Sequence, residues 1–160
     1  MEDQSLEETP LLSYIIPVYQ AESFIYNNLD LLVGFCSDSN PIRSEIIVVN
    51  DGSTDKTHEI IEDYINKNKT SVPIRYINLS RNVGKGLAIK KAVESAHGKY
   101  LIFTDCDLPY SFKDIKEVGY NLVHNGANVV IASRMHHDSI YKIRSSNLSY
   151  ICQAYSRKAL

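Results

Sequence analysis

The chain has 160 residues, a length that suits one domain better than two. Hydrophobic residues make up 44% and charged residues 22% of it, which is the composition of a folded domain and not of a disordered chain. The net charge of −2 excludes a broad basic surface, so we expect no nucleic-acid partner. No apolar run approaches the roughly 18 residues that a membrane-spanning helix needs.

Charge divides the chain into an acidic start, a near-neutral middle and a basic end. Residues 1–10 lack the basic and apolar regions of a secretory signal, and we expect them to be an acidic flexible tail. Residues 11–160 are expected to form a single domain. The three cysteines fit neither a zinc spacing nor a disulfide framework, which indicates a reducing, cytoplasmic location.

Short apolar runs alternate with helical patterns along the chain. Runs rich in β-branched residues predict buried strands at 11–17, 45–50, 74–79, 100–104 and 128–133. Apolar residues at helical spacing predict helices at 23–35, 54–68, 85–97 and 111–125. This order predicts an α/β fold, with a mostly parallel sheet, right-handed crossovers and helices on both faces.

Several residues are expected to set the ends of these elements. Proline lacks an amide hydrogen, so Pro17 should stop the first strand. Ser53 and Thr54 should cap the second helix and Gly98 should end the third. The fourth helix should open on a capping box that begins at Ser111.

The sharpest functional feature is the pair Asp105 and Asp107, directly after the apolar run at 100–104. In an extended segment, residues i and i+2 point to the same side, about 6–7 Å apart. Two carboxylates placed in this way repel each other unless a cation joins them, and their oxygens suit Mg²⁺ or Mn²⁺. The alternative is a pair of solvated acids at a strand end. Polar residues follow the other predicted strands as well, where open α/β sheets bind ligands, and this coincidence favours the metal.

Three further side chains at this edge are candidate ligand-binding groups. Asp51 could accept a hydrogen bond from a ribose hydroxyl or a base, or could simply open a turn with Gly52. Lys85 could bind an anion near a helix start or belong to an ordinary turn, since its loop matches no phosphate-binding glycine pattern. Arg134 follows the fifth strand and could pair with a phosphate.

Five segments in chain order match one family: Pro17-Val18-Tyr19, Val49-Asn50-Asp51-Gly52-Ser53, Arg81-Asn82-Val83-Gly84-Lys85-Gly86, Asp105-Cys106-Asp107-Leu108 and Ser133-Arg134. With them the chain resembles the family-2 glycosyltransferases of the GT-A fold. Within that family it is similar to the polyprenol-phosphate glycosyltransferases, such as the dolichyl-phosphate mannose and glucose synthases. The resemblance implies a nucleotide-sugar donor and a divalent metal, Mg²⁺ or Mn²⁺.

The resemblance also implies roles for the residues that bind the nucleoside. The segment that matches Pro17, Tyr19 and Glu22 cradles the nucleoside in such enzymes, and the residue that matches Asp51 contacts the base. The usual Tyr-Asn-Glu motif is here Tyr19-Gln20-Ala21-Glu22, so Glu22 stands one position later than in the family.

The remaining roles concern the phosphates. The pair that matches Asp105 and Asp107 holds the metal and the ribose-diphosphate, and arginines such as Arg134 and Arg144 face the phosphates of donor or acceptor. Asp105, Asp107 and Arg134 are therefore the expected catalytic residues. Lys85 is expected to bind substrate.

Full members of the family continue into an acceptor-side segment, and we expect this chain to lack it. The resemblance implies that the acceptor is a polyprenyl phosphate and that the reaction inverts the configuration of the anomeric carbon. A phosphate oxygen is already anionic, so it can attack that carbon without a general base. Two alternatives stay open: a nucleotide-sugar-binding module without turnover, and a haloacid-dehalogenase-like phosphatase.

The basic end of the chain, 142–160, carries apolar residues at helical spacing. It predicts an amphipathic helix that packs on the sheet or the missing segment, or approaches an anionic membrane surface. The chain would then be peripheral at the cytoplasmic face of a membrane.

Overall fold

The computed structural model describes residues 10–39, 42–132 and 152–156. Six strands form one sheet in the order β3-β2-β1-β4-β6-β5. The strands are β1 (Leu12–Val18), β2 (Ser44–Asn50), β3 (Ile74–Asn78), β4 (Tyr100–Phe103), β5 (Val129–Ala132) and β6 (Cys152–Ser156). Strands β3, β2, β1 and β4 are parallel, which confirms the predicted mostly parallel α/β sheet.

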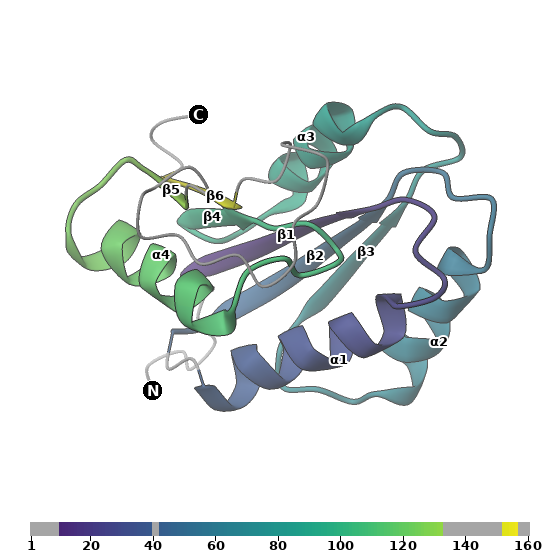
Figure 1. The fold of residues 1–160 in the computed structure, drawn as a ribbon, viewed down its shortest axis with the longest axis horizontal. Coiled ribbons are helices and arrows are strands. Elements are labelled where there is room, and N and C mark those ends of the chain that lie inside the picture. Colours follow the sequence, from purple (N-terminus) through teal and green to yellow (C-terminus); the bar gives the residue numbers. More distant parts are fainter. Residues whose placement is uncertain (1–9, 40–41, 133–151, 157–160) are drawn as a thin grey trace, which may run out of the picture.

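Helices cover both faces of the sheet, as predicted (Figure 1). They are α1 (Ile25–Gly34), continued by the π-helical turn η1 (Phe35–Ser39), α2 (Thr57–Lys67), α3 (Lys85–Ser95) and α4 (Phe112–His124). Helices α1, α2 and α4 pack on one face, where Leu29, Ile61 and Ile115 are buried. Among the described helices, α3 alone packs on the other face, through the small side chains of Ala88 and Ala92.

Strand β1 runs through Pro17 and ends at Val18, so the prediction that proline stops it was wrong. The carbonyls of Leu11 and Ile15 accept hydrogen bonds from the amides of Tyr100 and Thr104, at the two ends of β4. Alternate residues of a strand direct their backbone groups to the same side, so the backbone of Pro17 also faces β4. The pairing with β4 ends at Ile15 opposite Phe103. Because β4 ends at Phe103, no β4 residue pairs with Pro17. The missing amide hydrogen of Pro17 therefore costs no hydrogen bond between the two strands.

The basic end of the chain is not helical where the structure describes it. Residues 152–156 form β6, which pairs antiparallel with both β4 and β5, so the predicted helix over 142–160 is contradicted there. Residues 142–151 and 157–160 lie outside the described residues. Strand β5 is at the sheet edge, and Val129 and Ile131 on it are 43% and 52% exposed, whereas we expected a strand buried on both faces.

Helix α2 begins at Thr57, three residues after Thr54 and four after Ser53, so neither of these expected caps is at its N-cap position. Neither hydroxyl caps the helix, because Ser53 accepts from the Gln20 amide and Thr54 accepts from the Gln20 side chain. The capping box of α4 is present, with reciprocal hydrogen bonds between Ser111 and Asp114. None of the helices in the described ranges is long and apolar enough to cross a membrane.

Gly98 does not cap α3, whose C-cap is Ala96, but lies against the start of β1. A Cβ on Gly98 would stand 2.5 Å from Ser13 Oγ and 2.6 Å from Ser13 N, so only glycine fits there. Its amide donates to Ser13 Oγ at 2.9 Å. The position is thus required by close packing of two backbones and not by a helix end.

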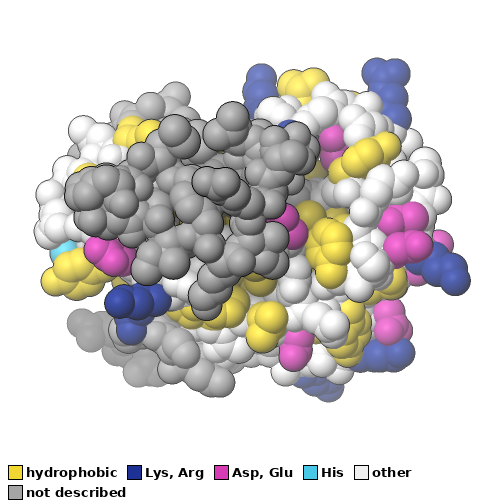
Figure 2. All heavy atoms as spheres, in the orientation of Figure 1, with side chains coloured by type: hydrophobic (Ala, Val, Ile, Leu, Met, Phe, Trp, Pro, Cys, Tyr) yellow, Lys and Arg dark blue, Asp and Glu magenta, His cyan; other side chains and the backbone are white. Residues whose placement is uncertain are grey.

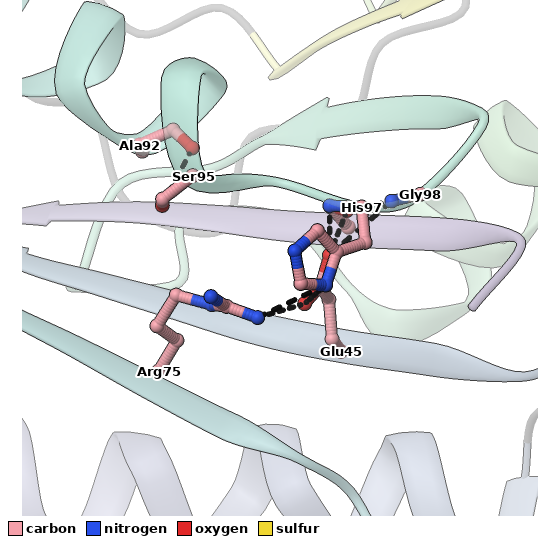
Figure 3. Close-up of polar contacts among 7 residues, drawn as sticks. Glu45, Arg75, Ala92, Ser95, His97 and Gly98 are labelled. Atoms are coloured by element: carbon pink, nitrogen blue, oxygen red, sulfur yellow. Dashed lines mark hydrogen bonds and ion pairs between the residues drawn. The ribbon is translucent and has the colours of Figure 1, made fainter. Parts of the chain in front are cut away.

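A buried carboxylate fixes the amino edge of the sheet (Figure 3). Glu45 Oε1 accepts hydrogen bonds from Ser13 Oγ and the His97 amide, both at 2.6 Å. Arg75 Nη2 lies 3.6 Å from Glu45 Oε2, so the positive guanidinium group offsets the negative charge of the carboxylate. Because a buried charge is tolerated only with such partners, this network holds the turn between α3 and β4 against β1 and β2.

Candidate functional site

The loops after β1 and β2 are joined by the side chain of Gln20. Its Oε1 accepts from the amides of Thr54 and Asp55 at 3.2 and 3.1 Å, and its Nε2 donates to Thr54 Oγ1 at 2.9 Å. Gln20 has a φ of 52°, which is uncommon for a residue other than glycine. A side chain held by three bonds stabilises this conformation, so the two loops form one unit.

Two acidic side chains strengthen the same junction. Glu22 Oε2 accepts from the Lys56 amide at 2.9 Å, and Asp55 Oδ2 accepts from the Glu22 amide at 3.2 Å. Desolvation acts to raise the pKa of Asp55, but hydrogen bonds from Thr57 and Glu22 outweigh it and hold that pKa below its ordinary value. The ionised form of Asp55 therefore stabilises the start of α2.

Asp51 connects the loop after β2 to the loop after β3. It is 4% exposed, and its two oxygens accept from the amides of Val83 at 2.8 Å and Gly84 at 2.9 Å. Gly52, with a φ of 65°, lies so close that a Cβ would stand 2.2 Å from the Arg81 carbonyl carbon. Asp51 does open a turn with Gly52, and it also fixes the backbone just before α3.

Asp105 connects the loop after β3 to the loop after β4. Its Oδ1 contacts the ammonium group of Lys85, the first residue of α3. Asp107 is exposed one residue beyond Cys106, in a turn where Leu108 has a φ of 47°. Among the described residues, the two non-glycine residues with positive φ, Gln20 and Leu108, thus both lie at this edge, as strained backbone at functional sites often does.

Cys106 lies between the two carboxylates, and its environment disfavours the thiolate. Burial, and then the charges of Asp107 and Asp105, raise the pKa of Cys106 to about 11. Its carbonyl accepts from Asn28 Nδ2 at 2.9 Å, which holds the loop against α1.

We therefore expect Cys106 to react with iodoacetamide at pH 8 about two orders of magnitude more slowly than an unperturbed cysteine, because little thiolate is present. The rate should rise with pH up to about 11. Peptide mass spectrometry in the presence of a chelator measures it, with the urea-unfolded chain as the control. Equal rates in folded and unfolded protein would contradict the burial.

The structure brings most of the predicted site residues to one edge of the sheet. Tyr19 is 48% exposed beside the loop junction, and Pro17 is buried beneath it. Glu22, Asp51, Lys85 and Asp105 take part in the contacts described above, and Asp107 adjoins them. Arg134 and Arg144 lie outside the described residues.

Three polar residues that hold the site together were missed from sequence: Gln20, Asn28 and Asn50. Asn50 Oδ1 accepts from Ser53 Oγ at 2.5 Å, and Asn50 Nδ2 donates to Asn78 Oδ1 at 2.8 Å. The signal for Asn50 is its amide side chain at the last position of a buried strand. Gln20 and Asn28 carry no comparable signal, since their partners are distant in sequence.

The side chains at the carboxyl edge of the sheet offer ligand atoms that suit a hard divalent cation bound together with a phosphate-bearing ligand. Asp105 and Asp107 offer carboxylate oxygens, and Lys85 already balances part of their charge. In the described part of the chain, no group of three or more His, Cys, Asp or Glu side chains could hold a metal ion by itself. Phosphate oxygens of a bound ligand would add to these two carboxylates as ligands of the cation.

A separate cavity of about 430 Å³ lies at the opposite, amino edge of the sheet. Its lining includes Arg43, His97, Lys99 and His124, near the last turns of α3 and α4. The charged side chains of this lining, Arg43 and Lys99, are both basic. On the face shown in Figure 2, the described Lys and Arg side chains stand apart from one another.

A comparison with family models decides the relationship. Residues 13–158 match the model described as glycosyl transferase family 2. The chain belongs to this family. It is 32% identical over 132 residues to a dolichyl-phosphate beta-glucosyltransferase of Dictyostelium discoideum, which covers 78% of this chain. The match removes the haloacid-dehalogenase-like alternative.

Solved structures confirm the GT-A fold of this family-2 chain. TarS 1–349 of S. aureus in complex with UDP-GlcNAc has a TM-score of 0.59 and 29% identity, and the match covers 74% of this chain and 32% of TarS. The mannosyltransferase PcManGT of Pyrobaculum calidifontis, in complex with GDP-Man and Mn²⁺, has a TM-score of 0.70 and 18% identity over 95% of this chain and 46% of PcManGT. The chain spans about 40% of the length of its Dictyostelium relative.

Proposed function

We propose that this chain is the donor-binding part of a glycosyltransferase that moves a sugar from a UDP- or GDP-sugar to a polyprenyl phosphate with inversion. The observation that carries the proposal is the set of four loops joined at one sheet edge around Asp51, Lys85, Asp105 and Asp107. The name of the Dictyostelium relative, a dolichyl-phosphate beta-glucosyltransferase, supports the choice of acceptor.

The nucleoside would lie over the loops after β1 and β2. Tyr19 is exposed there and offers a ring, and Pro17 and Glu22 shape and brace the floor beneath it. Each oxygen of Asp51 accepts one loop amide and keeps a further lone pair for a base N–H. The UDP-GlcNAc bound to TarS supports a nucleotide sugar as donor.

Asp105 and Asp107 would hold Mg²⁺ or Mn²⁺ together with the donor diphosphate. When bound, the metal would supply positive charge to the leaving diphosphate. The bond from the anomeric carbon to the diphosphate oxygen breaks as a bond to an acceptor phosphate oxygen forms, and the nucleoside diphosphate leaves. Because the attacking oxygen is already anionic, no general base is needed in this chain. Arg134 and Arg144 are proposed to face the phosphates.

The test is transfer by this chain from radiolabelled UDP-glucose and GDP-mannose to dolichyl phosphate, with octanol as a hydroxyl acceptor. The proposal predicts label on the lipid phosphate with inverted configuration by NMR, only when Mg²⁺ or Mn²⁺ is present. Transfer to the hydroxyl alone would contradict the acceptor. Donor binding without any transfer would favour the module without turnover.

A further inference from the structure

The ammonium group of Lys85 forms an ion pair with Asp105, one of the two carboxylates that the proposed function assigns to the metal. It contacts Oδ1 of Asp105, whose side chain is only 15% exposed, whereas the side chain of Lys85 is 54% exposed. A cation at contact distance offsets the negative charge of a carboxylate in this half-enclosed position. In the described structure that cation belongs to the chain itself.

The backbone before Lys85 is fixed by contacts independent of Asp105. Asp51 accepts from the amides of Val83 and Gly84, and Gly84 has a φ of 91° that turns the chain into α3. Gly52 packs directly against the same loop. The backbone of Lys85 is therefore held in place, while its long side chain can adopt different rotamers.

We infer that Lys85 is an internal counter-ion of Asp105 that a divalent cation displaces, after which its ammonium group binds the donor diphosphate. The inference rests on the proposed function and deepens it. Two cations cannot share one carboxylate oxygen without strong repulsion at contact distance. Once released, the ammonium group of Lys85 offers three hydrogen-bond donors. Lys85 is also the first residue of α3, and the start of a helix favours anions.

This exchange makes a prediction of opposite sign for the two ligands. Without Lys85, the carboxylates lose their internal competitor, so Mn²⁺ alone should bind more tightly. The same change removes a contact to the diphosphate, so UDP in the presence of saturating Mn²⁺ should bind more weakly. A residue that only supported the local structure would weaken both.

The experiment compares wild type, Lys85→Met and Lys90→Met. Lys90 is an exposed lysine on the same helix, so its replacement removes the same charge from α3 away from Asp105. The dissociation constant of Mn²⁺ alone is measured by electron paramagnetic resonance of the free ion, and that of UDP by calorimetry at saturating Mn²⁺. Circular dichroism establishes that each variant is folded.

We expect Lys85→Met to bind Mn²⁺ alone on the order of tenfold more tightly than wild type, and UDP on the order of tenfold more weakly. Lys90→Met should stay within about twofold of wild type in both measurements. Unchanged or weaker Mn²⁺ binding by Lys85→Met would overturn the exchange while leaving the proposed function standing. If neither wild type nor variant binds Mn²⁺ even with UDP, the metal site itself fails, and the exchange with it.

Discussion

Replacement of Asp105 or Asp107 by asparagine should abolish the Mn²⁺-dependent part of nucleotide-sugar binding and leave the fold intact. Loss of a group that only orients a metal ligand costs about 10–100-fold in metal affinity, so loss of a ligand should exceed about 100-fold. Folding should hardly change, because asparagine keeps the size of the side chain, and Asp107 is exposed and Asp105 half-buried at the end of β4.

Calorimetry of UDP-glucose and GDP-mannose, with Mn²⁺ and with chelator, measures the effect. Asp63→Asn is the matched control, since Asp63 pairs only with Lys67 on the exposed side of α2 in the described contacts. Its effect should be within about twofold. If Asp105→Asn and Asp107→Asn keep the full enhancement by Mn²⁺, neither carboxylate holds the metal.

Replacement of Gly52 by alanine should have the largest effect on the architecture of the site. At a φ of 65°, alanine costs about 1–2 kcal/mol, and its Cβ would stand 2.2 Å from the Arg81 carbonyl carbon and 2.4 Å from the Asn82 amide nitrogen. Both of these are backbone atoms, so the loops after β2 and β3 must separate. The free energy of unfolding should fall by at least about 2 kcal/mol, and donor affinity should fall with it because Asp51 loses its partners.

Urea denaturation and calorimetry on the same samples test this expectation. Gly86→Ala is the control: it lies in α3, has no atom within 4 Å of the added Cβ, and should be neutral or stabilising by up to about 1 kcal/mol. A Gly52→Ala protein with wild-type stability and donor affinity would mean that the two loops do not depend on each other.

The parallel part of the sheet and the edge that carries the site could be predicted from the sequence. Each central strand is an apolar run, and polar residues such as Asp51 and Asp105 follow at once where the run ends. Open α/β sheets bring the carboxyl ends of their strands together, so the location of these side chains follows from the order of elements alone.

The contacts between the loops could not be predicted, because they depend on which strands are neighbours. Lys85 meets Asp105 because α3 packs across β2 and β1, and β4 lies beside β1. Gln20 meets Thr54 because β2 pairs with β1 on its other side. Ser53 and Thr54 have the composition of helix caps, but the nearby Gln20 competes for their hydroxyls. Local propensity is overridden there by tertiary contacts.

The strand β6 was missed for a related reason. Residues 152–156 carry a pattern too short to separate a strand from one turn of a helix. They form a strand because they lie between β4 and β5 and pair with both. Both partner strands lie elsewhere in the sequence, so the sequence of the segment alone does not predict the strand.

Binding of the donor at the carboxyl edge of the sheet can be measured by an amide NMR titration of the ¹⁵N-labelled chain with UDP-glucose and GDP-mannose in the presence of Mg²⁺. We expect the amides of Gln20, Gly52, Gly84 and Cys106 to shift on addition of at least one of the two donors. The amides of Leu11, Arg43 and Lys99, which line the cavity at the amino edge, should stay in place. Shifts confined to the amino-edge amides, with Gly52 and Gly84 unmoved, would contradict donor binding at the carboxyl edge.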